Sequence, residues 1–356
     1  IALTRTGEID IARLENIQLP GTQLAEILVE RKNDGLFFLT TEGAQLDISP
    51  FLTLSGSGSH PDFGFDITAD QITVGSSLFL SGNIVGEKRA STEGKALLQG
   101  TITTDKSTRF EQTQLDIQFG SDGFVAKGTG LIGGAEASIS YEKLKDGRKQ
   151  LYILSEKGGR VLDGLAITDA IKGGVIELKT VFSADNDDSF VTTILMNDFR
   201  LIKGTRAIRV YSVLSPTGLF SLFEGEGTYF SRGDAIIKSE GGVHEISALR
   251  AEGASVGLGV VGMYDRNTKQ ADISGNLVPI NLLSEIIGNV PLIGTILTGI
   301  DNSGLLVTQF RVNGHIDDLD VEVNPLTLLV PGLFRDLFSP NWLDSEADRI
   351  FEGQKP

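Results

Sequence analysis

Apolar and polar residues alternate with a period of two along most of the chain, which is typical of β-strands with one apolar and one polar face. The stretch TQLDIQF at 113–119 sets Leu115, Ile117 and Phe119 against Asp116 and Gln118. Similar runs recur from end to end, and roughly twenty can be counted, many longer than the five or six residues of an average strand. The pattern therefore predicts a mainly β fold.

Turn residues separate these runs. Clusters of Gly, Asn and Asp stand at 32–35, 146–147, 185–188 and 265–267. These residue types tolerate positive φ or bond to their own backbone, so the clusters predict hairpin tips. Short connections without a βαβ rhythm favour an antiparallel sheet. Twenty strands spaced at about 4.8 Å would extend on the order of 90 Å, so the sheet must curl, split or close.

Four stretches depart from the alternation and show apolar residues at helical spacing. They are 159–172, 205–223, 280–298 and 325–338. The segment 275–300 carries a single charge, Glu285, but Gly288 and Pro291 divide its helical part into pieces of roughly eight residues. A membrane span needs about 20 residues. The sequence therefore predicts a helical hairpin buried on the sheet rather than a span.

Composition limits the classes of partner. Glycine accounts for 43 of 356 residues, well above the roughly 7 % of ordinary proteins, and suits strand punctuation. The net charge is −16 without a basic cluster, which argues against nucleic acid and against adhesion to an anionic bilayer. The absence of cysteine excludes disulfides and thiolate chemistry but leaves the compartment open.

Motifs for catalysis are weak. The glycines of 257–262 satisfy G-x-G-x-x-G but lie inside an alternating strand without a following helix. Ser and His occur together at 55–60 without the frame of a nucleophile elbow, so we expect a linker there. We therefore expect no catalytic residue and no cofactor.

Metal ligands are equally sparse. His60, His244 and His315 are isolated and share no ligand spacing. The acidic run at 185–188 lacks the glycine and distal glutamate of an EF-hand loop, so a solvated hairpin tip is the simpler interpretation. We expect no metal site.

Two longer stretches resemble a known family. The run that begins GEGTYFSRGDAIIKSEGG and ends PLIGTILTG, at 225–299, is followed by FRVNGHIDDLDVEVNPLTLLVPGLFRDLF at 310–338. Together they look like the AsmA-like C-terminal domain of YhdP-type proteins. The likeness is clearest over 200–338, extends more loosely back to about residue 70, and continues upstream in style only, through GAQLDISPFL and AITDAIKGGVIEL.

This resemblance implies an envelope protein that an N-terminal helix, absent here, anchors in the inner membrane and that projects through the periplasm of a Gram-negative bacterium. The chain opens at Ile1 without Met or a signal-like segment, so we expect a monomeric fragment of a longer protein. Residues 1–338 are then a single elongated β-groove segment and 339–356 a polar tail. Inner- and outer-membrane components would be reached through the full-length protein.

The family is thought to carry phospholipid along a repeating β-groove with an apolar floor. Exposing roughly thirty acyl CH2 groups to water costs on the order of 20 kcal/mol, which an apolar trough would remove. Alternating apolar residues supply non-directional contact, which suits sliding. The lining residues predicted for the groove or its end helices are Leu115, Ile117, Phe119, Leu282, Leu283, Ile286, Leu292, Ile293 and Ile296.

Two alternatives remain open. Alternating strands also form the solvent-free cores of β-sandwiches, which we call the dry-core alternative. Hydrophobic helices on the open face would likewise fill the trough with side chains. The resemblance to TamB-like relatives also allows an assembly scaffold, in which an exposed sheet edge receives a strand of an outer-membrane protein client.

Overall fold

The structure is a computed structural model that describes most of the chain. The described residues are 2–3, 9–48, 62–74, 78–89, 93–104, 108–120, 123–202, 226–254, 256–279 and 306–328.

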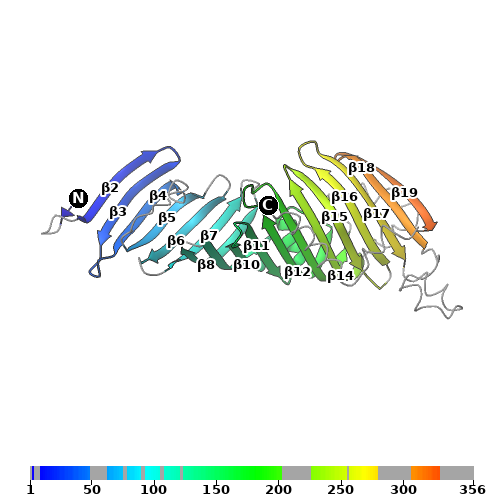
Figure 1. Cartoon of the computed structure of the whole chain (residues 1–356), viewed down its shortest axis with the longest axis horizontal. Coiled ribbons are helices and arrows are strands. Elements are labelled where there is room, and N and C mark those ends of the chain that lie inside the picture. The colour runs from blue at the N-terminus through cyan, green and yellow to red at the C-terminus, as the bar shows by residue number, and fades with distance from the viewer. Residues whose placement is uncertain are drawn as a thin grey trace. The chain divides into compact units, whose positions relative to one another are not determined.

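Nineteen strands of the described chain belong to one long, largely antiparallel sheet, accompanied by a single short helix (Figure 1). The mainly β prediction is confirmed. The chain divides into an N-terminal unit, 1–151 with 163–167, and a C-terminal unit, 152–162 with 168–356. The two units are considered separately below.

The N-terminal unit contains ten complete strands and the first residues of an eleventh. They are β1 Ala2–Leu3, β2 Ile9–Leu19, β3 Thr22–Arg31, β4 Phe37–Asp47, β5 Phe63–Val74, β6 Leu78–Lys88, β7 Gly94–Thr104, β8 Arg109–Gly120, β9 Gly123–Ile132, β10 Ala135–Lys143 and the start of β11, Lys149–Ser155.

The C-terminal unit contains the rest of β11, most of the helix and eight further strands. They are α2 Gly158–Gly164, β12 Ile171–Phe182, β13 Phe190–Leu201, β14 Thr228–Glu240, β15 Val243–Glu252, β16 Val256–Asp265, β17 Gln270–Pro279, β18 Leu306–His315 and β19 Asp318–Leu328.

The predicted hairpin tips are confirmed. The amide of Lys32 donates to the carbonyl of Leu36, and that of Leu144 to Arg148, which closes the β3–β4 and β10–β11 turns. The clusters at 185–188 and 265–267 lie between paired strands β12–β13 and β16–β17 in the same way. Asn, Asp and Gly therefore mark the turns as their backbone chemistry predicts.

One strand pair corrects the expectation of an antiparallel sheet. Strands β4 and β5 are parallel, with Phe37 opposite Phe63 and Asp47 opposite Thr73. A parallel pair needs a crossover rather than a hairpin, and the chain between these strands is correspondingly long.

The helix predictions are only partly right. The stretch 159–172 forms the seven-residue α2, but β12 begins at Ile171. The stretch 325–338 begins as strand, because β19 continues to Leu328. The stretches 205–223 and 280–298 lie outside the described residues.

The segment 275–300 begins as the last part of β17, and its remainder is outside the described residues. Within the described chain, no helix has both the length and the apolar character that crossing a membrane requires.

Candidate functional site

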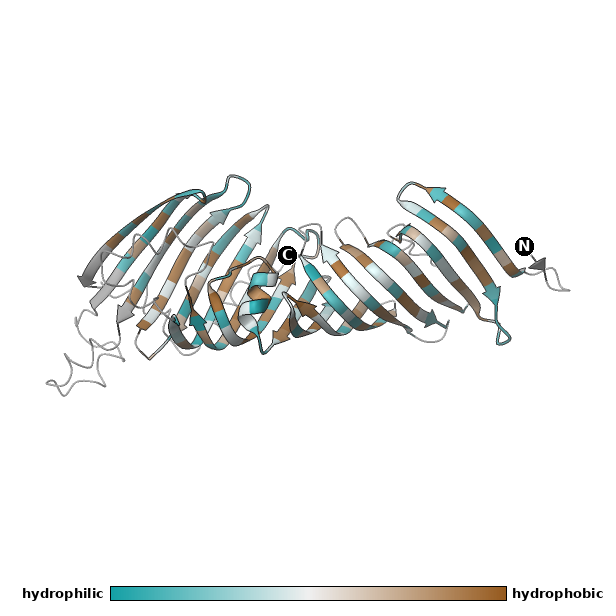
Figure 2. Ribbon diagram, turned by 180° about the vertical axis from the view of Figure 1, so that it is seen from behind, coloured by the Kyte–Doolittle hydropathy of each residue, from teal (hydrophilic) through white to brown (hydrophobic). Residues whose placement is uncertain are grey.

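The register of the N-terminal unit aligns apolar residues of successive strands into rows. In the middle row, Ile84 of β6 lies opposite Ile67 of β5, and Leu98 of β7 lies between Ile84 and Leu115 of β8. A second row crosses β5 to β9 in the same register and consists of Ile72, Leu80, Ile102, Phe110 and Ile132. Figure 2 shows the resulting alternation of hydrophobic and hydrophilic bands along the strands.

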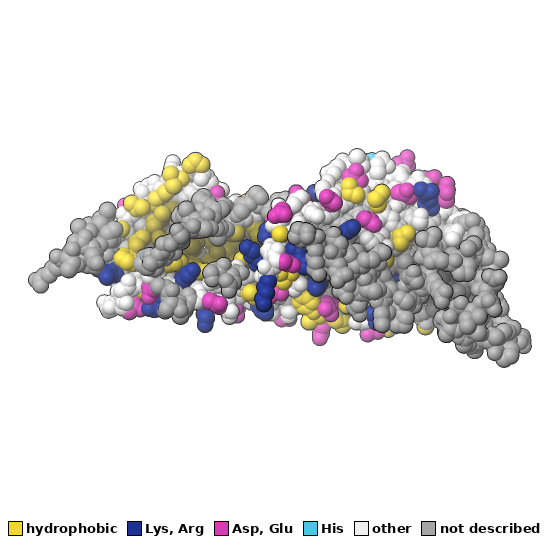
Figure 3. All heavy atoms as spheres, in the orientation of Figure 1, with side chains coloured by type: hydrophobic (Ala, Val, Ile, Leu, Met, Phe, Trp, Pro, Cys, Tyr) yellow, Lys and Arg dark blue, Asp and Glu magenta, His cyan; other side chains and the backbone are white. Residues whose placement is uncertain are grey.

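We call the side of the sheet that carries these rows the apolar face and the opposite side the polar face. Hydrophobic side chains gather on a hollowed surface over the N-terminal strands in Figure 3. Burial varies along the strands: Ile72 and Ile132 are completely buried, whereas Phe124 near one end is 38 % exposed and Leu78 near the other is 39 % exposed. The apolar face is therefore partly open at both ends of its strands.

Bulges and glycines bend this sheet. Gly82 and Gly100 face each other on β6 and β7 with φ of 155° and 149°. A Cβ on Gly82 would lie 2.1 Å from the carbonyl oxygen of Gln99, so only glycine allows this approach of the two backbones. The register also shifts between Ala69 and Ile72 of β5. Such features increase twist and bend a strand.

Aromatic residues concentrate at the end of the strands that carries Phe124, which we call the aromatic end. The rings of Phe63 and Phe65 are 6.2 Å apart, and Phe119 of β8 lies 6.4 Å from Phe65. Phe124 is opposite Phe119 in register and 5.4 Å from Tyr141 of β10. These rings form an aromatic row across β5 to β10.

Three of the predicted lining residues share the apolar face. Leu115 is buried in the middle row, while Ile117 and Phe119 are half-buried toward the aromatic end. The other six, Leu282, Leu283, Ile286, Leu292, Ile293 and Ile296, lie outside the described residues. Their role as lipid-binding residues stays a prediction.

Two open depressions lie on the polar face. One of about 380 Å³ is lined by Phe38, Val85 and Leu97 with the charged Glu87, Lys95 and Asp116 around them. The other, of about 740 Å³, is lined largely by polar residues that include Glu42, Asp70 and Asn83. The lining of the second depression also includes the hydroxyl residues Thr68 and Ser81.

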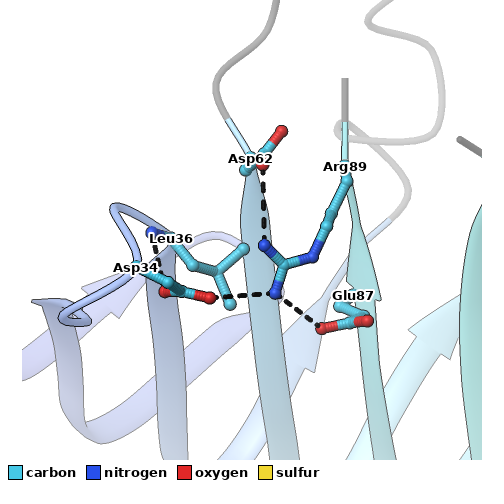
Figure 4. Close-up of polar contacts among 5 residues, drawn as sticks. All are labelled: Asp34, Leu36, Asp62, Glu87 and Arg89. Atoms are coloured by element: carbon cyan, nitrogen blue, oxygen red, sulfur yellow. Dashed lines mark hydrogen bonds and ion pairs between the residues drawn. The ribbon is translucent and has the colours of Figure 1, made fainter. Parts of the chain in front are cut away.

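Arg89 forms a network of polar contacts on the polar face at the aromatic end (Figure 4). The guanidinium donates to Asp34 at 3.0 Å and lies 3.8 Å from Asp62 and 3.7 Å from Glu87. Asp34 also accepts from the amide of Leu36, which shapes the β3–β4 turn. The hydrogen bond from Arg89 is the main cause that lowers the pKa of Asp34.

Replacing Arg89 by glutamine is expected to raise the pKa of Asp34 toward its ordinary value of 3.8. The lowered pKa means that this carboxylate contributes stability above its unfolded pKa and loses it as the pH falls through the folded pKa. Carboxyl NMR titration of wild type and Arg89→Gln measures the change. Asp146, whose pKa Arg148 lowers in a separate turn, is the internal control. An unmoved Asp34 would show that the ion pair is absent in solution.

In the C-terminal unit, α2 covers part of one face of the sheet. A Cβ on Gly158 would lie 2.7 Å from the Cε of Met196 and 2.9 Å from the Cβ of Ile176, so the helix sits directly on β12 and β13. Val161 and Leu162 of the helix are buried. At this position the dry-core alternative describes the packing, because side chains of the chain itself fill the face.

The two described histidines have polar neighbours. His244 shares a 2.8 Å hydrogen bond with Ser239, and His315 lies 3.5 Å from Asp317. His60 is outside the described residues. Glycines 257–262 lie inside β16, as the alternation predicts. The described residues contain no group of three or more His, Cys, Asp or Glu that could hold a metal ion.

The sequence did not reveal the aromatic row. Each aromatic residue is visible in its own strand, but their alignment depends on the register, which bulges in β5 and β8 displace. Alternation alone identifies which residues of a strand share a face and cannot identify their cross-strand partners.

Searches of protein-family models, curated proteins and solved structures find no match to this chain.

Proposed function

We propose that this chain is part of a non-enzymatic protein that carries phospholipid by its acyl chains along the apolar face of the N-terminal unit. The observation that supports the proposal is the row-by-row continuity of apolar residues across β5 to β9, partly open at the aromatic end. Rows of aliphatic side chains give uniform contact, so an acyl chain gains burial without a fixed binding position.

A place in the periplasm, between an inner-membrane anchor and the outer membrane, follows from the resemblance to AsmA-like proteins. The direction of transfer and the partners at either end belong to the same proposal. The chemistry required of this chain is limited to covering acyl chains, because phospholipid transfer makes and breaks no covalent bond.

Lipid extraction from the purified protein, followed by mass spectrometry, tests the proposal. Wild type should hold phospholipid, and Ile117→Asp should lower the bound amount about ten-fold, because it places a charge among acyl chains. Gln118→Asp adds a carboxylate one position along the same strand, on the polar face, and should leave the amount unchanged.

Because Ile117 is half-buried, Phe124→Asp provides a second variant at an exposed position. Circular dichroism checks that each variant folds. Wild type that contains no phospholipid and takes up none from vesicles would refute the proposal. Equal lipid in wild type, Ile117→Asp and Phe124→Asp would refute the assignment to this face.

An assembly scaffold is the second candidate. Strand β1 pairs with β2 at only two positions, Ala2 with Ile11 and Leu3 with Ile9, although β2 is 11 residues long. The remaining outer edge of β2 has no partner among the described strands, and such edges can accept a further strand. Lipid-free protein that captures an unfolded β-barrel strand would favour this function.

A further inference from the structure

Cationic residues flank the aromatic row on the apolar face. Lys88, at the end of β6, lies opposite Phe63 in register. Arg31, at the end of β3, lies opposite Phe37, and its guanidinium carbon is 5.7 Å from the centre of that ring. Lys143 follows Tyr141 by two residues on β10, so strand alternation places it on the same face.

The β10–β11 hairpin adds a further cation. The Leu144 amide donates to the carbonyl of Arg148, and the side chain of Gln150 donates to Glu142 at 3.2 Å. This register places Lys149 beside Lys143. Basic residues on β3, β6, β10 and β11 therefore line the aromatic end of the apolar face. We call Arg31, Lys88, Lys143 and Lys149 the basic border.

Acidic residues at the same end belong mainly to the other face. Glu87 and Glu142 each precede a lysine of the border by one residue, so alternation directs them to the polar face. Glu87 lies 3.7 Å from Arg89, and Glu142 accepts from Gln150. Among the described residues, neither Lys88 nor Lys143 has an ion pair.

Arg31 differs from these lysines. Ile11 lies opposite Glu30 in register, so the preceding residue of β2, Asp10, falls beside Arg31 on the same face. The charge of the border therefore rests on Lys88 of β6 and Lys143 of β10.

The opposite end of the strands carries no such border. There Val74 lies opposite Leu78, and Leu78 opposite Thr104. Arg109 pairs with Thr103 and so belongs to the polar face. Across the described parts of β5 to β8, the apolar face thus changes from uncharged at one end to cationic at the other.

We propose that the basic border at the aromatic end binds the phosphate of anionic phospholipids, such as phosphatidylglycerol, whose acyl chains lie on the apolar face. This inference rests on the proposed function and specifies its substrate class. A phosphate diester offers acceptor oxygens to the lysines, and aromatic rings suit the boundary between acyl chain and head group. A zwitterionic head group carries its own cation and gains less from the border.

The spacing between the lysines of the border suits stepwise passage of a phospholipid along the sheet. Lys88 and Lys143 are four strands apart, about 19 Å along the sheet at 4.8 Å per strand. One phosphate cannot reach both, so each lysine is a separate contact. Lysine is a flexible, strongly hydrated point charge, so each contact selects for charge and releases the head group readily.

The test compares Lys88→Gln/Lys143→Gln with Lys95→Gln/Lys127→Gln. Both double variants remove two charges, but Lys95 and Lys127 lie on the polar face of β7 and β9. Binding of fluorescent phosphatidylglycerol and phosphatidylcholine is measured for wild type and both variants at two salt concentrations. Inorganic phosphate is included as a competitor that lacks acyl chains.

Wild type should prefer phosphatidylglycerol, and Lys88→Gln/Lys143→Gln should weaken that binding about three- to ten-fold while phosphatidylcholine binding stays constant. The control variant should resemble wild type, and phosphate should compete poorly. An equal loss in both variants would show a general charge effect and overturn the border. Equal binding of both lipids by all proteins would overturn the border and leave the proposed function intact. If wild type binds neither lipid, both proposals fail.

Discussion

Gly128→Ala is expected to destabilise the N-terminal unit by about 3 kcal/mol or more, although alanine ordinarily suits a strand better than glycine. Gly128 of β9 lies between Leu115 and Ile139 in the middle row of the apolar face. A Cβ there would lie 1.8 Å from the carbonyl oxygen of Gln114 and 3.0 Å from the Cα of Leu115. Both contacts are with backbone atoms, so no side-chain rotation relieves them.

Hydrogen exchange measured by mass spectrometry gives the local readout, because the β8–β9 amides should lose protection first. Urea unfolding gives the global change. Gly120→Ala is the matched control on the neighbouring strand: its Cβ would meet the Cγ of Glu93 at 3.5 Å, an ordinary contact. Unchanged protection of β8 and β9 in Gly128→Ala would show that the two backbones do not approach each other this closely.

The backbone contact between Gly128 and Gln114 joins two strands, and contacts of this kind are not visible in a sequence. Features that depend on local chemistry are. Strands and hairpin tips depend on local chemistry, namely period-two alternation and residues that accept turn conformations. Both are visible in β8 and in the cluster at 32–35, and the structure confirms both. The sharing of one face by Leu115, Ile117 and Phe119 also follows from a local period.

The helix predictions failed where pairing between distant segments determines the backbone. Ile171 lies opposite Leu201, and the amide of Ile202 donates to the carbonyl of Ala170, so the ladder extends β12 back to residues that helical spacing also fits. Leu328 lies opposite Leu306 in the same manner. An apolar run that satisfies two periods takes the conformation that its partner strand allows.

The basic border could not be predicted from the sequence for a related reason. Lys88 and Phe63 are 25 positions apart, and only the pairing of β5 with β6 brings them opposite each other. A one-residue change of register would direct Lys88 away from the row. The substrate-class proposal therefore depends on the bulge of β5 between Ala69 and Ile72, which sets that register.

The second large change in stability is expected from mutating a buried ion pair in the C-terminal unit. The Nε of Arg250 on β15 donates to both carboxylate oxygens of Asp234 on β14 at 2.9 Å, and the two residues are opposite each other in register. The side chains are only 4 % and 1 % exposed. Arg232 lies 3.5 Å from the same carboxylate but is half-exposed.

Burial raises the pKa of Asp234 above 3.8, and the hydrogen bond from Arg250 opposes that rise. Arg250→Met removes the opposition and leaves a buried carboxylate uncompensated, so the free energy of unfolding at neutral pH should fall by about 3–5 kcal/mol. With a raised folded pKa, the contribution of Asp234 is fully present below the unfolded pKa and is lost as the pH rises through the folded pKa. The deficit of the variant should therefore be smaller near pH 4.5 than at pH 7.5.

Urea unfolding at the two pH values measures both effects. Asp234→Leu/Arg250→Met replaces the pair with apolar side chains and should recover most of the lost stability, because neither charge then needs compensation. Arg232→Met removes a charge that touches the same carboxylate from a half-exposed position and should cost less than about 1 kcal/mol. If Arg250→Met is no more harmful than Arg232→Met, or if its deficit is the same at both pH values, the carboxylate is not confined and desolvated in solution as the structure places it.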